Sequence, residues 1–261
     1  DISRDIREAS KRLYNSKEYN QKGYSKDIIF AMSNTGKNIK SGESLEIEGI
    51  DTQLPEMIYS KNILDILYNR NLTDIPDSYS KIKHKLAGKA LDRFDIISSQ
   101  FSMHYYFENM DTLMSFIINI SENIKPQGYF IGTCYNGYNV YETLNSDRQN
   151  GKLEYNDELG NKVYSIEKSY DVIPNDFKYT SDNFKEIDKY LGHKIKVYME
   201  TIGQELEEYL VNFDMFTDLM THQGFVLESP PGSLNKDGIE SFGDTYEKFL
   251  KLDEPSKFGQ S

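Results

Sequence analysis

Cysteine and positive charge are both scarce in this sequence, and each scarcity excludes a class of protein. Cys134 is the single cysteine, which rules out an internal disulfide framework and a cysteine-rich zinc site and favours a reducing, intracellular location. The 30 Lys and Arg residues are outnumbered by 42 Asp and Glu residues, and the formal net charge is −12. Such a chain has no general electrostatic affinity for DNA or RNA, so any nucleic-acid ligand must be held by a local pocket.

Long apolar segments are absent as well. No run approaches the roughly 18 apolar residues of a membrane span, and DISRDIREASKRL at the N-terminus lacks the apolar core of a signal peptide. We therefore expect a soluble protein with no membrane partner. The histidines lack the spacing of metal ligands, so no metal is predicted: they are His84, His104, His193 and His222.

The hydrophobic content, 38% of 261 residues, is enough for a sizeable core, and we expect a single domain. Short apolar runs at 27–32, 94–99 and 128–134 predict buried strands that pair in parallel. Between the second and third runs, one apolar stripe predicts a crossover helix, formed by Leu113, Phe116, Ile117, Ile120 and Ile124. Strand, helix and strand in this order make a βαβ unit, which indicates an α/β fold with a mostly parallel central sheet flanked by helices.

The remaining segments follow other patterns. Alternation at 162–168 and 194–201 predicts antiparallel strands that the second half adds to the sheet, and FDMFTDLM (213–220) predicts a helix. Residues 46–92 contain helical and polar stretches, and we interpret them as a helical insertion between two strands.

Polar and aromatic residues follow the strand at 94–99. Gln100, His104 and Tyr105 lie within six residues of one another, at the carboxyl end of a strand, where open α/β sheets bind their ligands. The alternative interpretation is that His104, Tyr105 and their aromatic neighbours only pack under a loop. Spacing alone does not decide between the two interpretations.

Two stretches bear a specific resemblance. FDIISSQFSMHYYFE (94–108) and NIKPQGYFIGT (123–133) resemble the mRNA cap guanine-N7 methyltransferase family, and further stretches at 1–5, 33–45 and 202–213 agree with it in order. The loops look most similar to versions encoded by large DNA viruses, in which the domain is often the C-terminal part of a longer capping enzyme. The resemblance implies a Rossmann-like fold that uses S-adenosylmethionine, with S-adenosylhomocysteine as product.

The resemblance also implies cofactor-binding residues. Asp1 resembles the acid that accepts hydrogen bonds from the ribose hydroxyls of the cofactor, and a helix cap is its alternative role. Asn34 lies where the family usually has an Asp at the adenine end, and it is equally well interpreted as a turn residue. Gln100 resembles the residue at the methionine end of the cofactor, and Tyr105 resembles a residue near the sulfonium.

The cap guanine has its own implied contacts. His104 and Tyr105 resemble the pair that meets the guanine, and Glu208 resembles the acid that accepts from guanine N1–H and the exocyclic amine. Packing for His104 and a solvated charge for Glu208 are the alternatives. No catalytic acid or base is expected, because guanine N7 has a free lone pair and no proton to remove.

Two parts of the family pattern are missing from the sequence. The first strand with its Gly-rich turn would precede Asp1 and a last strand would follow Ser261, so we expect a domain truncated at both ends and of doubtful activity alone. A non-catalytic cap-binding or partner-binding subunit and a small-molecule methyltransferase remain alternatives. The expected partners are 5′-capped RNA, other capping-enzyme domains and a stimulatory subunit. The expected location is the host cytoplasm or virion for a viral protein and the nucleus for a cellular one.

Overall fold

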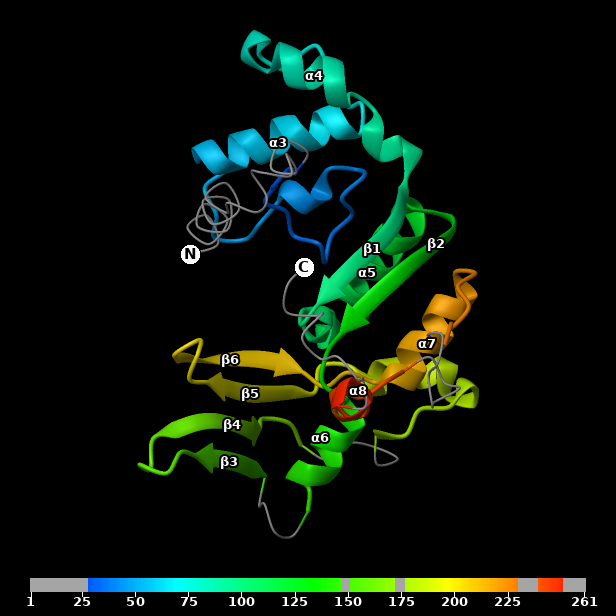
Figure 1. Cartoon of the computed structure of the whole chain (residues 1–261). Coiled ribbons are helices and arrows are strands. Elements are labelled where there is room, and N and C mark those ends of the chain that lie inside the picture. Colours follow the sequence, from blue (N-terminus) through cyan, green and yellow to red (C-terminus); the bar gives the residue numbers. More distant parts are fainter. Residues whose placement is uncertain (1–27, 147–150, 172–176, 230–238, 251–261) are drawn as a thin grey trace. The chain divides into compact units, whose positions relative to one another are not determined.

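A computed structural model describes residues 28–146, 151–171, 177–229 and 239–250. The chain divides into two compact units, residues 1–215 and 216–261, and each is described by itself. The first unit contains, in order (Figure 1), α3 (Pro55–Leu67), α4 (Ser80–Leu86), β1 (Phe94–Gln100), α5 (Met110–Asn123), β2 (Ile124–Thr133), α6 (Gly137–Leu144), β3 (Lys152–Asn156), β4 (Lys162–Lys168), β5 (Lys194–Met199) and β6 (Gln204–Tyr209). Helix α7 (Phe213–His222) runs across the boundary at Met215, and the second unit also contains α8 (Phe242–Leu250).

The predicted βαβ unit is confirmed. Strands β1 and β2 pair in parallel, with Ile97 opposite Phe130, and α5 connects them. Helix α5 begins after Asn109, whose side chain accepts a hydrogen bond from the Thr112 N–H, as expected of an N-cap residue. Its buried stripe packs on one face of the two strands, where the rings of Phe116 and Phe130 lie 6.0 Å apart (Figure 1).

The opposite face of β1 and β2 differs from the expected burial. Phe94, Ile96, Tyr129 and Ile131 are exposed there, although both strands were predicted to be buried. Strands that are apolar on both faces are typical of a sheet covered on both sides. The residues that the structure describes cover only the face on which α5 packs.

The predicted antiparallel strands are present, and they form a sheet of their own. Strands β3, β4, β5 and β6 pair in chain order, and none of them pairs with β1 or β2 in the described part of the chain. The expectation that they extend the parallel sheet is therefore wrong. Helix α6 separates β2 from β3 along the chain, and three antiparallel pairings join the four strands.

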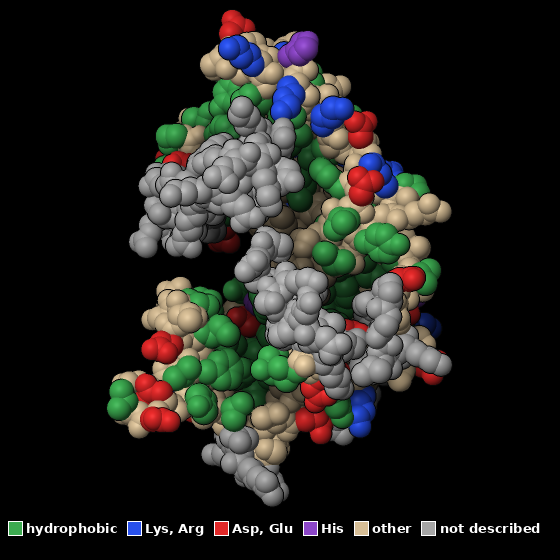
Figure 2. Space-filling view, viewed as in Figure 1, with side chains coloured by type: hydrophobic (Ala, Val, Ile, Leu, Met, Phe, Trp, Pro, Cys, Tyr) green, Lys and Arg blue, Asp and Glu red, His purple; other side chains and the backbone are tan. Residues whose placement is uncertain are grey.

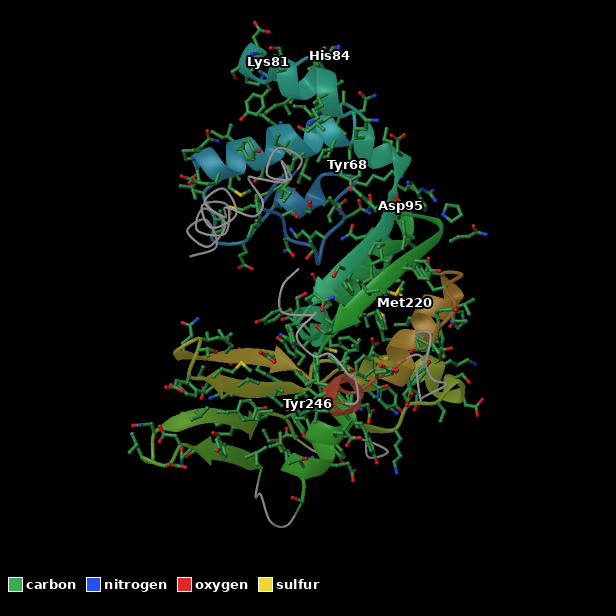
Figure 3. The ribbon with its side chains drawn as sticks, in the orientation of Figure 1. Tyr68, Lys81, His84, Asp95, Met220 and Tyr246 are labelled. Atoms are coloured by element: carbon green, nitrogen blue, oxygen red, sulfur yellow. The ribbon has the colours of Figure 1, made fainter. Side chains whose placement is uncertain are left out.

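The prediction of a strand at 27–32 is also wrong, because its described residues, 28–32, form no strand. The Met32 N–H donates to the Ser60 hydroxyl on α3 (2.7 Å) instead of to a strand, and Ala31 packs against a cluster that includes Tyr68. Tyr68, labelled in Figure 3, donates its hydroxyl to Asn123 Oδ1 on α5 (2.6 Å). This segment is therefore apolar because it packs on α3.

Helices α3 and α4 lie within the segment 46–92 that was predicted to be helical. Its status as an insertion stays a prediction. No helix in the described ranges is long and apolar enough to cross a membrane.

Candidate functional site

The site begins where β1 and β2 end. Gln100 ends β1 beside Thr133, the last residue of β2; its Oε1 accepts from the Thr133 hydroxyl (2.7 Å) and its Nε2 donates to Ser98 Oγ (2.9 Å). Phe101 then adopts a φ of +51°, which is uncommon for a residue with a side chain, while its N–H donates to the Thr133 carbonyl (2.8 Å). This turn leads the chain from the strand into a 3₁₀ segment, Met103–Glu108, that carries His104 and Tyr105.

His104 and Glu208 come together in the interior, although they are far apart in the sequence. Their side chains approach to 3.5 Å between Nε2 and Oε1, and the two residues are only 5% and 8% exposed. Within the described part of the chain, neither ring nitrogen of His104 has a hydrogen-bond partner. A buried polar group without a partner costs free energy, and such groups often face a ligand.

Aromatic rings surround this pair. The Tyr105 ring meets His104 edge-on, with centroids 4.2 Å apart, and the Tyr135 ring stacks on it at 5.6 Å. Tyr164, on β4, lies on the same face of the four-stranded sheet as Glu208, and burial, followed by the Glu208 carboxyl, raises the pKa of its hydroxyl. We call the group formed by His104, Glu208, Tyr105, Tyr135 and Tyr164 the imidazole-carboxyl site.

Glu208 reaches this site from the apolar face of β6. It lies directly opposite Ile195, which is fully buried, and alternation along the strand places Leu206 on the same face. Glu205 and Glu207, by contrast, are on the other face and pair with Lys196 and Lys194. Sequence patterns do not distinguish Glu207 from Glu208, but the strand register does.

Two contacts hold the segment between β2 and α6 against the last residue of β6 and the segment that follows it. The Tyr135 hydroxyl donates to the Tyr209 carbonyl, and Gly137 is packed directly on the Val211 backbone. A Cβ on Gly137 would lie 2.3 Å from the Val211 carbonyl oxygen, so only glycine fits there. These contacts join the two sheets at the point where His104 and Glu208 meet.

Of the two residues predicted to bind the adenosine part of the cofactor, the structure describes only Asn34. Asp1 lies outside the described residues. Asn34 accepts a hydrogen bond from the Gly36 N–H through its Oδ1 (3.0 Å), an arrangement typical of a turn residue. Asn119 of α5 holds the same loop, because it donates to the carbonyls of Thr35 (2.9 Å) and Lys37 (2.8 Å).

Comparison with known proteins identifies the family of the chain. Residues 52–235, more than half of the chain, match the family model described as the mRNA (guanine-N(7))-methyltransferase domain. The chain belongs to this family. The matched segment includes Gln100, His104, Tyr105 and Glu208, whereas Asp1 and Asn34 precede it.

Individual relatives of this methyltransferase-family chain are cellular and viral. A protein named mRNA cap guanine-N(7) methyltransferase from Cryptococcus neoformans is 31% identical over 52% of the chain and 19% of its own length. A Saccharomyces cerevisiae protein of the same name is 27% identical over 52% of the chain and 29% of its own length. A probable mRNA-capping enzyme of Acanthamoeba polyphaga mimivirus is 28% identical over 69% of the chain and 14% of its own length. The chain thus spans well under half the length of these relatives.

Two site residues of this family member were missed by sequence reasoning, Tyr135 and Tyr164. Tyr135 follows the recognised GYFIGT strand by two residues, so its position after a strand end was a usable signal. Tyr164 carries no such signal, because only the pairing of β4 with β5 brings its face toward Glu208.

Burial shifts the pKa values of His104 and Glu208. It lowers the pKa of His104 to about 4 and raises the pKa of the Glu208 carboxyl to about 7. At neutral pH the imidazole is therefore uncharged, with one nitrogen able to donate and the other able to accept. Burial, and then the Glu208 carboxyl, raises the pKa of the Tyr135 hydroxyl, so this group stays protonated.

Replacing Glu208 with Gln should make stability depend differently on pH. The folded pKa of about 7 exceeds the ordinary value of 4.5, so the unfolded chain ionises first and the carboxyl destabilises the fold progressively from pH 4.5 to 7. The loss reaches about 3 kcal/mol above pH 7. We expect the Glu208→Gln protein to gain melting temperature relative to the parent, by several degrees, between pH 5 and pH 8.

Glu207→Gln is the matched control for this measurement. Its carboxylate is exposed on the other face, and a hydrogen bond from Lys194 lowers its pKa, so its removal should give no relative gain as the pH rises. Thermal unfolding followed by circular dichroism gives both differences. A Glu208→Gln difference that stays constant from pH 5 to pH 8 would show that Glu208 ionises as an ordinary carboxyl.

Proposed function

We propose that this chain forms the cap-guanine site and part of the methyl-donor site of an enzyme that transfers a methyl group from S-adenosylmethionine to N7 of the guanine cap of RNA. Family membership supports this proposal. The observation that carries it is that the buried imidazole of His104, which has no hydrogen-bond partner among the described residues, lies 3.5 Å from the buried carboxyl of Glu208.

The order of groups in the pair suits guanine. On the Watson–Crick edge, guanine presents the O6 acceptor directly beside the N1–H donor and then the exocyclic amine. An imidazole N–H beside a carboxylate offers the complementary order, with His104 donating to O6 and Glu208 accepting from N1–H and the amine. Adenine presents a donor where guanine has O6 and an acceptor at N1, so it would meet both groups in the wrong order.

The described residues at the carboxyl ends of β1 and β2 fit the methionine end of S-adenosylmethionine. Gln100 is exposed and presents an amide among the hydroxyls of Ser98 and Thr133, and Tyr105 presents a half-exposed ring. Amide groups can bind the amino-acid part of the cofactor, and an aromatic ring attracts a cation such as a sulfonium. When bound, S-adenosylmethionine supplies a methyl group on a positively charged sulfur.

The protein's contribution is then orientation and exclusion of water. His104 and Glu208 fix the guanine edge, and the Tyr105 and Tyr135 rings beside the imidazole restrict the plane of the base. No residue needs to remove a proton, because the attacking N7 carries a lone pair. Alignment of this kind lowers the barrier by proximity and by a preorganised electrostatic environment.

Replacing His104 with Ala should impair the use of capped RNA much more than the binding of S-adenosylmethionine. We expect transfer to capped RNA to fall roughly 30-fold or more, because the O6 donor and the packing of two rings are both lost, while the affinity for S-adenosylmethionine changes less than about threefold. Single-turnover methyl transfer and calorimetric titration measure the two quantities.

His84→Ala is the control, since His84 is an exposed histidine on α4 (Figure 3). If His104→Ala transfers methyl groups at nearly the parental rate, His104 only packs in the core and does not contact the guanine. If the parent chain binds guanine nucleotides but transfers no methyl group, the non-catalytic alternative explains the site better.

A further inference from the structure

One row of side chains crosses three strands of the four-stranded sheet, β3, β4 and β5, near their hairpin ends. Strand pairing places Tyr155 opposite Tyr164, and Tyr164 opposite Met199. We call these three residues the outer row. Alternation along β5 and β6 places the outer row on the same face of the sheet as Val197 and Glu208.

The outer row is open, whereas the interior of the same face is covered. Ile166 and Val197, the next row inward, are buried, but Tyr155 is 64% and Met199 42% exposed. Ile202, in the turn between β5 and β6, is a further 49% exposed apolar residue. Figure 2 shows hydrophobic side chains gathered over this sheet. An apolar surface next to a polar site is a common mark of ligand contact.

The outer row is continuous with the imidazole-carboxyl site through Tyr164. This residue is half-buried, and the strand register places it on the same face as Glu208. The opposite face of the sheet has a different character, because its lysines and glutamates pair with each other, as in Lys194 with Glu207 at 2.8 Å. Tyr155 and Tyr164 therefore give the face of Glu208 an exposed aromatic path that leads away from the guanine position.

We propose that the outer row stacks on the base of the first nucleotide after the cap guanine, with Tyr155 as its main contact. This inference rests on the proposed function. A capped RNA continues beyond the guanine, and a chain of net charge −12 cannot hold that continuation by general attraction to phosphate. Aromatic stacking provides affinity without charge and accepts any base, as an enzyme acting on many transcripts requires.

The test compares two probes, GTP and the capped dinucleotide GpppA with 2-aminopurine in place of the adenine. The chain contains no tryptophan, so the 2-aminopurine signal can be read without interference. We expect the dinucleotide to bind roughly tenfold more tightly than GTP, with its fluorescence quenched by stacking. Tyr155→Ala should abolish the quenching and reduce the dinucleotide affinity to that of GTP, and Tyr155→Phe should retain both.

Tyr129→Ala is the matched control, because Tyr129 is an equally exposed tyrosine that lies on β2. Equal affinities for the two probes, or full quenching with Tyr155→Ala, would overturn the inference while leaving guanine recognition intact. So would sedimentation showing that Tyr155→Ala removes self-association, because a second copy would then occupy the outer row. Failure of GTP itself to bind would contradict the proposed function and, with it, this inference.

Discussion

Replacing Glu208 with Gln is expected to lower the affinity for guanosine-capped RNA roughly 30-fold or more, with the affinity for S-adenosylmethionine unchanged. The side chain keeps its size, but it loses the charge and can point an amide donor at the donors of guanine. Removing one partner of a buried, charged hydrogen-bond pair typically costs about 2 kcal/mol or more, and about 1.4 kcal/mol corresponds to tenfold. Glu208 is buried enough for this cost to apply in full.

A comparison of guanosine and inosine caps tests the role of Glu208 more specifically. Inosine lacks the exocyclic amine but retains N1–H and O6, so the parent protein should prefer guanosine caps over inosine caps. The Glu208→Gln protein should lose most of that preference, because its acceptor for the amine is gone. Methyl transfer by both proteins on both caps makes a four-way comparison. An unchanged guanosine preference in the mutant would remove Glu208 from guanine recognition, and Glu207→Gln serves as the control on the opposite face.

Sequence periodicity predicts those elements whose burial is decided within one segment. The apolar stripe of α5 appears where it was predicted, except that Ile124 begins β2, and the predicted alternation appears in β5, where Ile195 and Val197 are buried. The segment 28–32 misled the same reasoning. A continuous apolar run has no periodicity that distinguishes a strand from other buried segments. The hydrogen-bond partner of the Met32 N–H, the Ser60 hydroxyl of α3, lies far away in the sequence.

The candidate site was likewise predictable from the sequence only in part. His104 and Glu208 were identified because short motifs around them resemble a family, and the structure brings these two residues within 3.5 Å. Their pKa values were not predictable, since they follow from burial at the junction of two sheets. Tyr164 joins the site only through strand register, which no local pattern encodes, whereas the position of Tyr135 just after a predicted strand was a local signal that was not used.

Gly137 should be the most sensitive small residue of this junction. A Cβ at this position would lie 2.3 Å from the carbonyl oxygen and 2.5 Å from the nitrogen of Val211, and backbone atoms cannot rotate away as a side chain can. Val211 and Leu210 are fully buried, so the segment after β6 has no room to move outward. An added methyl group must therefore separate the end of β2 from the end of β6.

Gly137→Ala is accordingly expected to destabilise the chain by about 3 kcal/mol or more, at the upper end of the cost of overpacking. Guanine binding should weaken as well, because the same displacement moves Tyr135 on one side and Glu208 on the other. Urea unfolding and GTP titration measure the two effects. Gly243→Ala, in helix α8 with its nearest neighbour at an ordinary 3.5 Å, should be neutral or slightly stabilising. A Gly137→Ala protein with parental stability and parental GTP affinity would show that contact with Val211 does not position the imidazole-carboxyl site.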